Sequence, residues 1–277
     1  MVDTLVLGTS ALGREGSSPF PGTLLFAIME KFVSIQILGL SAGIPTKERT
    51  TSCTIISTSF QNFMIDCGEG AYRKYIQNGY DFSLLNYIFI THMHPDHISG
   101  LVPILFYKNI SNQLNDIKII GPAELKDYID FCLKKQDVVL KYNYQFYRLE
   151  TQKDIAINDI NINWLLLDHK ISSWGYKFSV NSKSIVFITD SRICQNSIIL
   201  SQNASILIHE ATFSDSDKKL AFEKFHSTPE EVVELALKSN VDTLILTHFS
   251  SDLSTNYLKN ISYKRKKCVI FDNKLYL

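Results

Sequence analysis

The chain has 277 residues, enough for one large α/β domain or two small ones, and its 45% of hydrophobic residues provides for a substantial core. Its 28 basic and 28 acidic residues balance, so bulk charge does not indicate a nucleic-acid partner, and binding such a polyanion would need a local basic patch. No run of about 18 apolar residues occurs, which argues against a membrane span.

The first 28 residues differ from the rest, because they are rich in glycine and proline and contain one arginine and no lysine. With only Arg14, they make a poor transit peptide, and they lack the basic region that begins a signal peptide. We therefore interpret residues 1–28 as an N-terminal extension outside the fold and residues 29–277 as one folded domain.

Short apolar runs alternate with helical stretches through the remainder of the chain, as is typical of α/β domains. The first strand is predicted from the alternation that begins at Met29, and further strands are predicted at 54–57, 63–66, 87–91, 117–120, 162–167, 175–180, 184–189, 205–209 and 243–247. Helices are predicted at 70–78, 124–135 and 228–239. The last helix has the clearest start, because Thr228 suits the N-cap, Pro229 suits the first turn and Glu231 completes a capping box.

The cysteines are odd in number and none forms a C-x-x-C pair, which argues against a disulfide framework and against a cysteine-based zinc site. We therefore expect a reducing compartment, either the cytoplasm or an organellar stroma or matrix. The cysteines are Cys53, Cys67, Cys132, Cys194 and Cys268.

A dense group of metal-ligating residue types directly follows one predicted strand. In an extended segment residues i and i+2 point the same way, so His92 and His94 can hold one ion, while Asp96 and His97, beyond the turn at Pro95, can face a second. Imidazole and carboxylate at this density suit zinc, with manganese and iron as alternatives. The competing interpretation is a polar loop with chance histidines, which the H-x-H-x-D-H spacing at a strand end disfavours.

The other histidines and one aspartate occupy comparable positions. His169, Asp190, His209 and His248 lie at or just beyond the ends of predicted strands, and His226 precedes the clearest helix. Strand ends present side chains to a common rim of a sheet, where sites are built. We therefore expect these side chains to gather around the first cluster.

These motifs resemble the metallo-β-lactamase superfamily, and within it most closely the ribonuclease Z branch of tRNA 3′-end-processing endonucleases. The H-x-H-x-D-H cluster is common to the superfamily, whereas H-E-A-T at 209–212 and H-S-T at 226–228 are more specific to this branch. The stretches that carry the resemblance run in family order from about residue 31 to 250, at 38–49, 66–70, 88–100, 121–122, 169, 175–176, 209–213, 226–228 and 246–250.

The resemblance implies an α/β fold of four layers, an αβ/βα sandwich with two facing mixed sheets and helices on the outer faces. It makes 29–277 the catalytic domain, with two zinc ions per chain, a homodimer and precursor tRNA as substrate. Seven side chains would bind the metals. They are His92, His94 and His169 for one ion, Asp96, His97 and His248 for the other, and Asp190 bridging the two.

The resemblance also implies catalytic and substrate-binding roles. Asp96 would orient or deprotonate the attacking water, His226 would protonate the leaving 3′-oxygen, and Glu210 would orient His226. Lys47 and Arg49 would contact substrate phosphates. Each residue has a plainer interpretation: Glu210 as a buried charge at a strand end, His226 as a residue that merely precedes a helix, and the two basic residues as solvated charges. The basic run at 264–267 is more typical of a solvated surface than of a nucleic-acid site.

One departure from the family leaves the substrate open. Many ribonuclease Z enzymes carry a long tRNA-gripping arm between the residues equivalent to His169 and Asp190, but here a strand pair with a turn at Asn181 and Ser182 fills that interval. In addition, Asp252 stands in a position where the family often has tyrosine. We expect removal of the 3′ trailer from tRNA precursors, with a phosphodiesterase for small substrates such as cyclic nucleotides as the alternative. A non-catalytic metal-binding module is disfavoured by the complete set of site residues.

Overall fold

The computed structural model describes residues 34–253, 257, 267–269 and 275–276, and the described strands form two mixed sheets of seven strands each. The extension expected at 1–28 and the basic run at 264–267, apart from Lys267, lie outside these residues. Among the described helices, none has both the length and the apolar character that crossing a membrane requires.

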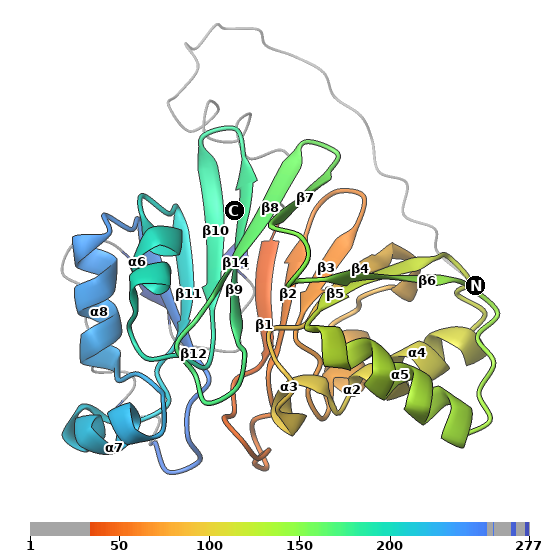
Figure 1. The fold of residues 1–277 in the computed structure, drawn as a ribbon, viewed down its shortest axis with the longest axis horizontal. Helices are drawn as coiled ribbons and strands as arrows, with labels where there is room; N and C mark the ends of the chain where they lie inside the picture. Colours follow the sequence, from red (N-terminus) through yellow and green to blue (C-terminus); the bar gives the residue numbers. More distant parts are fainter. Residues whose placement is uncertain (1–33, 254–256, 258–266, 270–274, 277) are drawn as a thin grey trace, which may run out of the picture.

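The first sheet has the strand order β14-β1-β2-β3-β4-β5-β6 (Figure 1). Strands β14, β1, β2 and β3 pair antiparallel, whereas β3, β4, β5 and β6 run parallel. The strands are β1 (Ser34–Gly39), β2 (Cys53–Ser57), β3 (Asn62–Ile65), β4 (Leu85–Phe89), β5 (Ile117–Gly121), β6 (Tyr144–Arg148) and β14 (Leu275–Tyr276).

The second sheet has the strand order β13-β12-β11-β10-β9-β8-β7. Strands β10 to β13 run parallel, and β7 to β10 pair antiparallel. The strands are β7 (Asp154–Ile157), β8 (Ile160–Leu166), β9 (Trp174–Val180), β10 (Lys183–Ile188), β11 (Ile206–Glu210), β12 (Thr243–Thr247) and β13 (Lys267–Val269).

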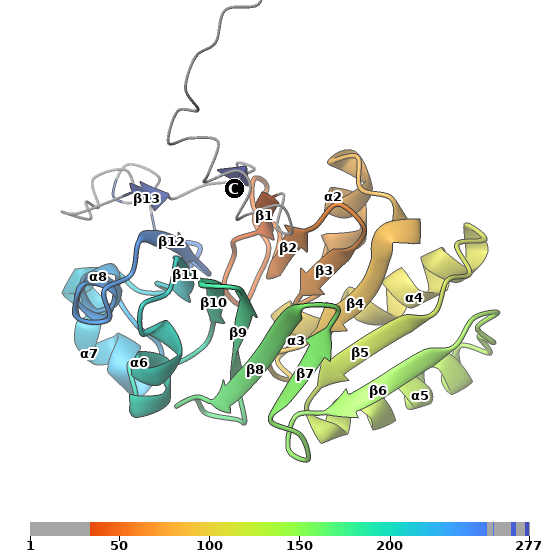
Figure 2. The ribbon, with the colours of Figure 1, turned by 90° about the horizontal axis from the view of Figure 1, so that it is seen from above.

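Helices lie on the outer side of each sheet, so the molecule has four layers (Figures 1 and 2). This arrangement confirms the αβ/βα sandwich. Beside the first sheet lie α2 (Ala71–Gln77), α4 (Leu101–Ile110) and α5 (Ala123–Lys135), with the short α3 (Pro95–Ile98) and η1 (Phe82–Leu84) in the connections. Beside the second sheet lie α6 (Gln195–Ser201), η2 (Asp215–Asp217), α7 (Lys218–Glu223) and α8 (Pro229–Lys238).

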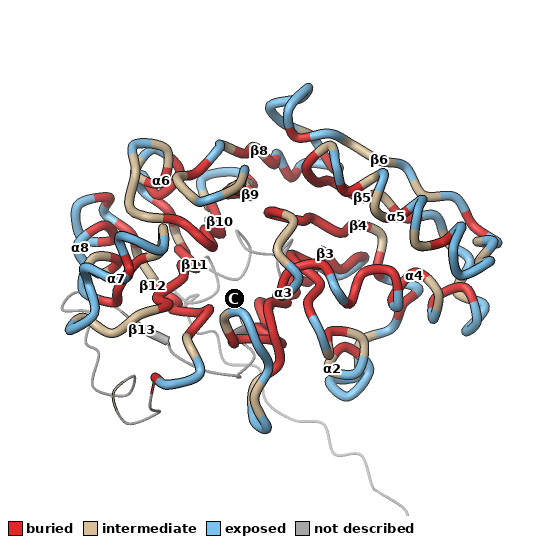
Figure 3. The backbone as a smooth tube through the Cα atoms, turned by 60° about the horizontal axis from the view of Figure 1, so that its bottom comes forward, coloured by how far each residue is buried: buried red, intermediate tan, exposed pale blue. Residues whose placement is uncertain are grey.

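Most strands of the two sheets are buried (Figure 3), whereas β6 and β7 at the sheet edges are largely not. The buried strands carry apolar side chains on both faces. In β3, Phe63 and Ile65 belong to the core between the sheets, while Met64 belongs to the core under the helices. This is the alternation of successive side chains that a strand imposes. The ring of Phe63 lies 5.8 Å from that of Phe178 in β9, so the two sheets pack directly against each other.

The predicted elements are present, with boundaries that move by no more than two residues, except that the strand predicted from Met29 is described only from Ser34. The capping box of α8 is confirmed, because the Thr228 N–H donates to Glu231 Oε2 at 3.1 Å. The turn between β9 and β10 is also confirmed at Asn181 and Ser182, and Asn181 has the positive φ of 52° that such a short hairpin favours. The sequence did not predict the helices α3, α4, α6, α7, η1 and η2 or the strands β6, β7, β13 and β14.

The loops that follow β4, β10, β11 and β12 lie along one edge of the molecule, at the bottom of Figure 1. Positive φ occurs at or just beyond the ends of β3, β10 and β12, at Asp66 (57°), Asp190 (48°) and His248 (57°). Such backbone is uncommon outside glycine and gathers at functional sites. The strained positions therefore indicate a candidate functional site at this edge.

Candidate metal centre and catalytic cavity

The segment after β4 brings four side chains of ligand type together. His94 is the extended N-cap of α3, and Pro95 occupies the first helical position, where its missing N–H costs no hydrogen bond. His92 and His94 thus precede the helix, while Asp96 and His97 lie in its first turn. The Nε2 atom of His92 and the Nδ1 atom of His94 are 3.0 Å apart.

Close packing of backbones behind α3 fixes this turn. The Cys67 N–H donates to the His97 carbonyl at 2.7 Å, and the Gly100 N–H donates to the Cys67 carbonyl at 2.8 Å. A Cβ at Gly68 would lie 2.2 Å from the Asp96 carbonyl oxygen, and one at Gly100 would lie 2.2 Å from the Gly68 carbonyl oxygen. Only glycine allows this approach, so both positions hold the turn that carries Asp96 and His97.

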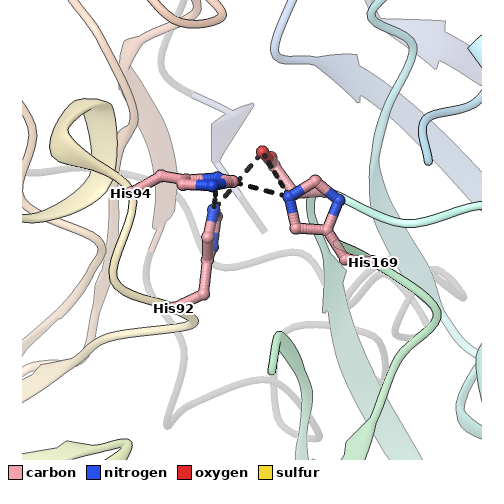
Figure 4. Close-up of side chains that lie close together, drawn as sticks. His92, His94 and His169 are labelled. Atoms are coloured by element: carbon pink, nitrogen blue, oxygen red, sulfur yellow. Dashed lines mark hydrogen bonds and ion pairs between the residues drawn. The ribbon is translucent and has the colours of Figure 1, made fainter. Parts of the chain in front are cut away.

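Three imidazole nitrogens and one carboxylate oxygen form the first candidate ligand group (Figure 4). Besides its contact with His92, His94 Nδ1 lies 3.2 Å from Nε2 of His169, in the loop after β8. Asp190 Oδ2, beyond β10, lies 3.4 Å from His92 Nε2 and 3.8 Å from His169 Nε2. Figure 4 shows the three labelled rings pointing toward one another, so the group joins the two sheets.

A second group is formed by Asp96, His97 and His248. His248 Nε2 lies 3.2 Å from His97 Nε2 and 3.2 Å from Asp96 Oδ2. Asp190 Oδ1 lies 3.1 Å from His248 Nε2 and 3.4 Å from His97 Nε2. The two carboxylate oxygens of Asp190 therefore face different groups, which is the geometry of a bridging ligand.

Hydrogen bonds on the far side of the rings determine which nitrogen faces the centre. His97 Nδ1 lies 2.8 Å from Asp66 Oδ2, and His169 Nδ1 lies 3.1 Å from the carbonyl oxygen of Phe225. Because a carbonyl only accepts, and an ionised carboxylate likewise, both Nδ1 atoms carry the proton. In the neutral ring, each Nε2 then keeps a lone pair directed at the centre, as metal-binding histidines require.

His248 is held in the same tautomer by a hydroxyl. Thr212 Oγ1 donates to Glu210 Oε2 at 2.5 Å, so it accepts from Nδ1 of His248 at 3.0 Å. This leaves the lone pair of His248 on Nε2, toward Asp96 and Asp190.

The charges and donors of this centre fit divalent metal ions. In the described part of the chain, its buried carboxylates form ion pairs with histidines alone. Buried charge is costly unless it is compensated, and two divalent cations would balance four carboxylates. Imidazole nitrogens and carboxylate oxygens are donors that bind zinc and other divalent metal ions. The carboxylates are those of Asp66, Asp96, Asp190 and Glu210.

The surroundings of three histidines and of Asp96 favour the protonation states that bind metal. Burial, together with the nearby His97, lowers the pKa of His92 to about 4. Burial also lowers the pKa of His94 and of His169. Although burial opposes its ionisation, hydrogen bonds from neighbouring histidines hold the pKa of Asp96 well below its ordinary value. Neutral imidazole and ionised carboxylate are the forms that act as ligands. His97 differs, because the effect of burial is outweighed by the Asp190 and Asp66 carboxylates, which raise its pKa well above the ordinary value.

Glu210 and His226 form an acid–base pair beside the second group. His226 Nδ1 lies 2.9 Å from Glu210 Oε1, which also accepts the Ser191 N–H at 2.7 Å. Although burial alone lowers the pKa of His226, the Glu210 carboxylate raises it to about 9. His226 is therefore protonated at neutral pH in this surrounding, with its Nδ1–H held by Glu210.

A cavity of about 420 Å³ opens onto this centre. Its lining includes members of both groups and His226, namely Ala42, Gly43, His94, Pro95, Asp96, Asp190, Thr212, Phe213, His226, His248 and Ser250. A second cavity of about 340 Å³ adjoins it through Phe213 and Ser250, and its lining includes the carboxylates of Asp217 and Asp252.

The expected substrate-binding residues Lys47 and Arg49 lie on the loop between β1 and β2, outside the lining of the catalytic cavity. Lys47 is exposed, whereas Arg49 Nη2 donates to the Ser251 carbonyl at 3.2 Å. The Gly43 N–H of the same loop donates to Asp96 Oδ2 at 2.7 Å. Arg49 thus ties this loop to the segment after β12.

Some residues of the centre received no role from the sequence. Asp66 directly follows β3, a strand-end position like those that identified the other candidates, and this signal could have found it. Thr212 lies within the H-E-A-T motif, whereas the Phe225 carbonyl is main chain and leaves no mark in a sequence. His209 lies outside both ligand groups, and its Nδ1 donates to the Glu210 carbonyl at 2.8 Å.

Known proteins resemble this chain along most of its length. The family described as anti-Pycsar protein Apyc1 matches residues 33–267. A ribonuclease Z of Prochlorococcus marinus strain MIT 9215 is 31% identical over 275 aligned positions, covering 79% of this chain and 88% of the relative. A ribonuclease Z of Crocosphaera subtropica is 28% identical, covering 79% and 86%. Because 275 positions include only 79% of this 277-residue chain, part of the Prochlorococcus sequence has no counterpart here.

Solved structures share the fold. Human tRNase Z, short form, superposes with a TM-score of 0.76 at 24% identity, covering 87% of this chain and 98% of the human chain. The metallo-β-lactamase fold protein YhfI from Bacillus subtilis gives a TM-score of 0.77 at 19% identity, covering 89% and 100%. At these identities the likeness concerns the fold.

Proposed function

We propose that this chain, which belongs to the family described as anti-Pycsar protein Apyc1 and to the ribonuclease Z family, hydrolyses phosphodiester bonds and removes the 3′ trailer from tRNA precursors. Ribonuclease Z is part of the metallo-β-lactamase superfamily, a superfamily of metal-dependent hydrolases. The observation that carries this proposal is the Glu210–His226 pair, which lies beside two ligand groups that share Asp190. This combination supplies an acid for a leaving oxygen next to a site for two metal ions.

Two zinc ions are the cofactors in this proposal, because histidine and carboxylate donors bind zinc. One ion is assigned to His92, His94 and His169, the other to Asp96, His97 and His248, with Asp190 between them. When bound, such a pair supplies Lewis acidity, which lowers the pKa of water from ~16 to about 7 and neutralises charge on phosphoryl oxygens.

The chain's own residues handle the protons in this reaction. The Gly43 N–H holds Asp96 at the cavity wall, where its carboxylate orients the attacking water or accepts its proton. Glu210 holds the Nδ1–H of His226, so the opposite nitrogen, Nε2, is the one left to give its proton to the leaving 3′-oxygen. An alkoxide is a poor leaving group while it carries its negative charge, so this proton assists the departure of the 3′-oxygen.

A second candidate substrate is a small phosphodiester such as a cyclic nucleotide. Two observations favour it. The hairpin between β9 and β10 has only Asn181 and Ser182 at its turn, in the interval where the resemblance to ribonuclease Z would place a tRNA-gripping arm. Asp217 and Asp252 line the cavity that adjoins the catalytic one, and their charges oppose the approach of a polyanion.

One experiment separates the two substrates. Zinc-loaded protein is incubated at one salt concentration with a 3′-extended precursor tRNA and, separately, with 2′,3′- and 3′,5′-cyclic nucleotides. A cut after the discriminator nucleotide that leaves a 3′-hydroxyl supports trailer removal. Turnover of a cyclic nucleotide with intact tRNA supports the second candidate, and no hydrolysis of either contradicts both. His92→Ala serves as the inactive control.

A further inference from the structure

Arg192 joins three loops of the catalytic edge without lining the cavity. Its Nε donates to Asp168 Oδ2 at 2.9 Å and its Nη2 donates to Asp168 Oδ1 at 3.1 Å, a two-pronged ion pair. The backbones pair as well, since the Arg192 N–H donates to the Asp168 carbonyl at 3.0 Å. Arg192 lies two residues after Asp190, and Asp168 immediately precedes His169, so this pair links two proposed ligands.

The same guanidinium lies against two aromatic rings. It is 4.0 Å from the ring centroid of Phe225 and 4.4 Å from that of Phe222. A guanidinium at this distance attracts the face of a ring and also packs on it as a plane. Phe225 needs such support, because its φ of 63° is a strained conformation for a bulky residue.

Phe225 connects this contact to the site. Its carbonyl oxygen accepts the Nδ1–H of His169 at 3.1 Å, which fixes the ring so that Nε2 faces the centre. Its own peptide leads directly to His226, the proposed acid. The position of Phe225 therefore sets both the direction of one ligand and the start of the segment that carries the proton donor.

From these contacts we infer that Arg192 is a positioning residue: through Asp168 and the Phe225 ring it orients His169 for metal and His226 for proton transfer. This inference rests on the proposed function and deepens it. Lysine does not replace arginine here, because its point charge can form neither the two-pronged pair with Asp168 nor the flat contact with Phe225. An ion pair of this exposure contributes little stability by itself, so the value of Arg192 lies in the geometry it imposes.

The test measures metal affinity and turnover in Arg192→Met and Arg192→Lys. Zinc affinity is determined by competition with a chelator, without substrate, and kcat and KM are determined on whichever phosphodiester the wild type hydrolyses. We expect Arg192→Met to weaken the affinity for one zinc ion and to lower kcat, each by about 10–100-fold. Loss of a residue that orients a metal ligand typically has an effect of this size. KM should stay within about twofold, because Arg192 lies outside the cavity lining. Arg192→Lys should fall between the wild type and Arg192→Met.

Lys126→Met is the matched control, because Lys126 on α5 also combines an ion pair, with Asp130, and a cation–π contact, with Tyr144. It should leave zinc affinity and kcat unchanged. In a His169→Ala background, Arg192→Met should weaken zinc binding little further, since the effect on metal passes through His169.

Three results would overturn the inference. The first is an Arg192→Met protein with wild-type zinc affinity and kcat and only a lower Tm, which would mark a purely structural residue. The second is a raised KM with unchanged kcat, which would mark a substrate contact. The third is full additivity with His169→Ala. If the wild type hydrolyses neither substrate, the proposed function fails, while the zinc affinities still decide the role of Arg192.

Discussion

Asp66→Asn is the substitution that tests most directly how the centre is held. Asp66 is fully buried, and its Oδ1 accepts the Thr91 N–H at 2.9 Å while its Oδ2 accepts the His97 Nδ1–H at 2.8 Å. Asparagine has one acceptor oxygen in place of two. If that oxygen serves Thr91, the amide N–H groups face His97 Nδ1 and force the His97 proton onto Nε2, the atom that faces the second group.

The magnitude follows from the lost interaction. A hydrogen bond to a charged group contributes about 1.5–3 kcal/mol, and loss of a partner behind a metal ligand weakens metal binding or activity by about 10–100-fold. We therefore expect Asp66→Asn to weaken the affinity for one of the two zinc ions by about 10–100-fold and to lower kcat at least as much. Chelator competition and steady-state kinetics measure both quantities.

Asp81→Asn is the matched control, because Asp81 is an exposed carboxylate that accepts the backbone N–H of Ser83 at 2.8 Å, at the start of η1. It should change neither zinc affinity nor kcat. Asp66→Asn with zinc affinity and kcat within about twofold of the wild type would refute the reasoning that Asp66 sets the His97 tautomer.

Four further predictions concern the same centre and the cavity beside it. His226→Ala should keep both zinc ions while kcat falls by roughly 10²–10⁴-fold, and loss of an ion would instead make His226 a ligand. Glu210→Gln removes the carboxylate that raises the pKa of His226 to about 9, so a pH–rate profile should show the alkaline fall of kcat beginning at lower pH, because the acid acts in its protonated form; an unmoved profile would exclude His226 as the titrating acid. Asp252→Asn should lower KM for precursor tRNA by roughly two- to fivefold at low salt and less at high salt, and an unchanged KM would contradict repulsion by this carboxylate. Chelation of zinc should lower Tm by roughly 5–10 °C, with recovery when zinc is restored, and an unchanged Tm would contradict binding at this centre.

Strands were predictable here because their signal is local. β3 and β4 are short apolar runs whose burial on both faces leaves little room for polar residues. The helix α4 gave no comparable signal, because its sequence is apolar almost throughout and contains Pro103. Pro103 lies in the first turn, where its missing N–H loses no intrahelical bond, so it does not break the helix. An apolar segment with an internal proline cannot be identified as helix or strand by periodicity alone.

The candidate ligands were also predictable from local sequence signals, whereas the residues that position them were not. His92, Asp190 and His248 have side chains of ligand type at strand ends, where the geometry of a sheet predicts that they meet. The partner of His169 is the Phe225 carbonyl, which every residue type possesses. Arg192 likewise looks like any solvated arginine until the fold places it on the ring of Phe225. Such roles arise from contacts between distant segments, and a single sequence does not contain them.

The arrangement of the ligands also ties the centre to the packing of the two sheets. His92 and His94 follow a strand of the first sheet, whereas His169 and Asp190 follow strands of the second, so the first ligand group is complete only when the sheets are docked. The second group divides in the same way between α3 and His248. An ion that binds only the docked arrangement stabilises it, by about 2.7 kcal/mol at a free concentration 100 times its dissociation constant. That free energy is comparable to the cost of about 1–3 kcal/mol for each strained backbone position, and Asp190 and His248 are two such positions. Ions bound at this centre would therefore offset the backbone strain at the loop ends, while the fold holds the proposed ligands in place.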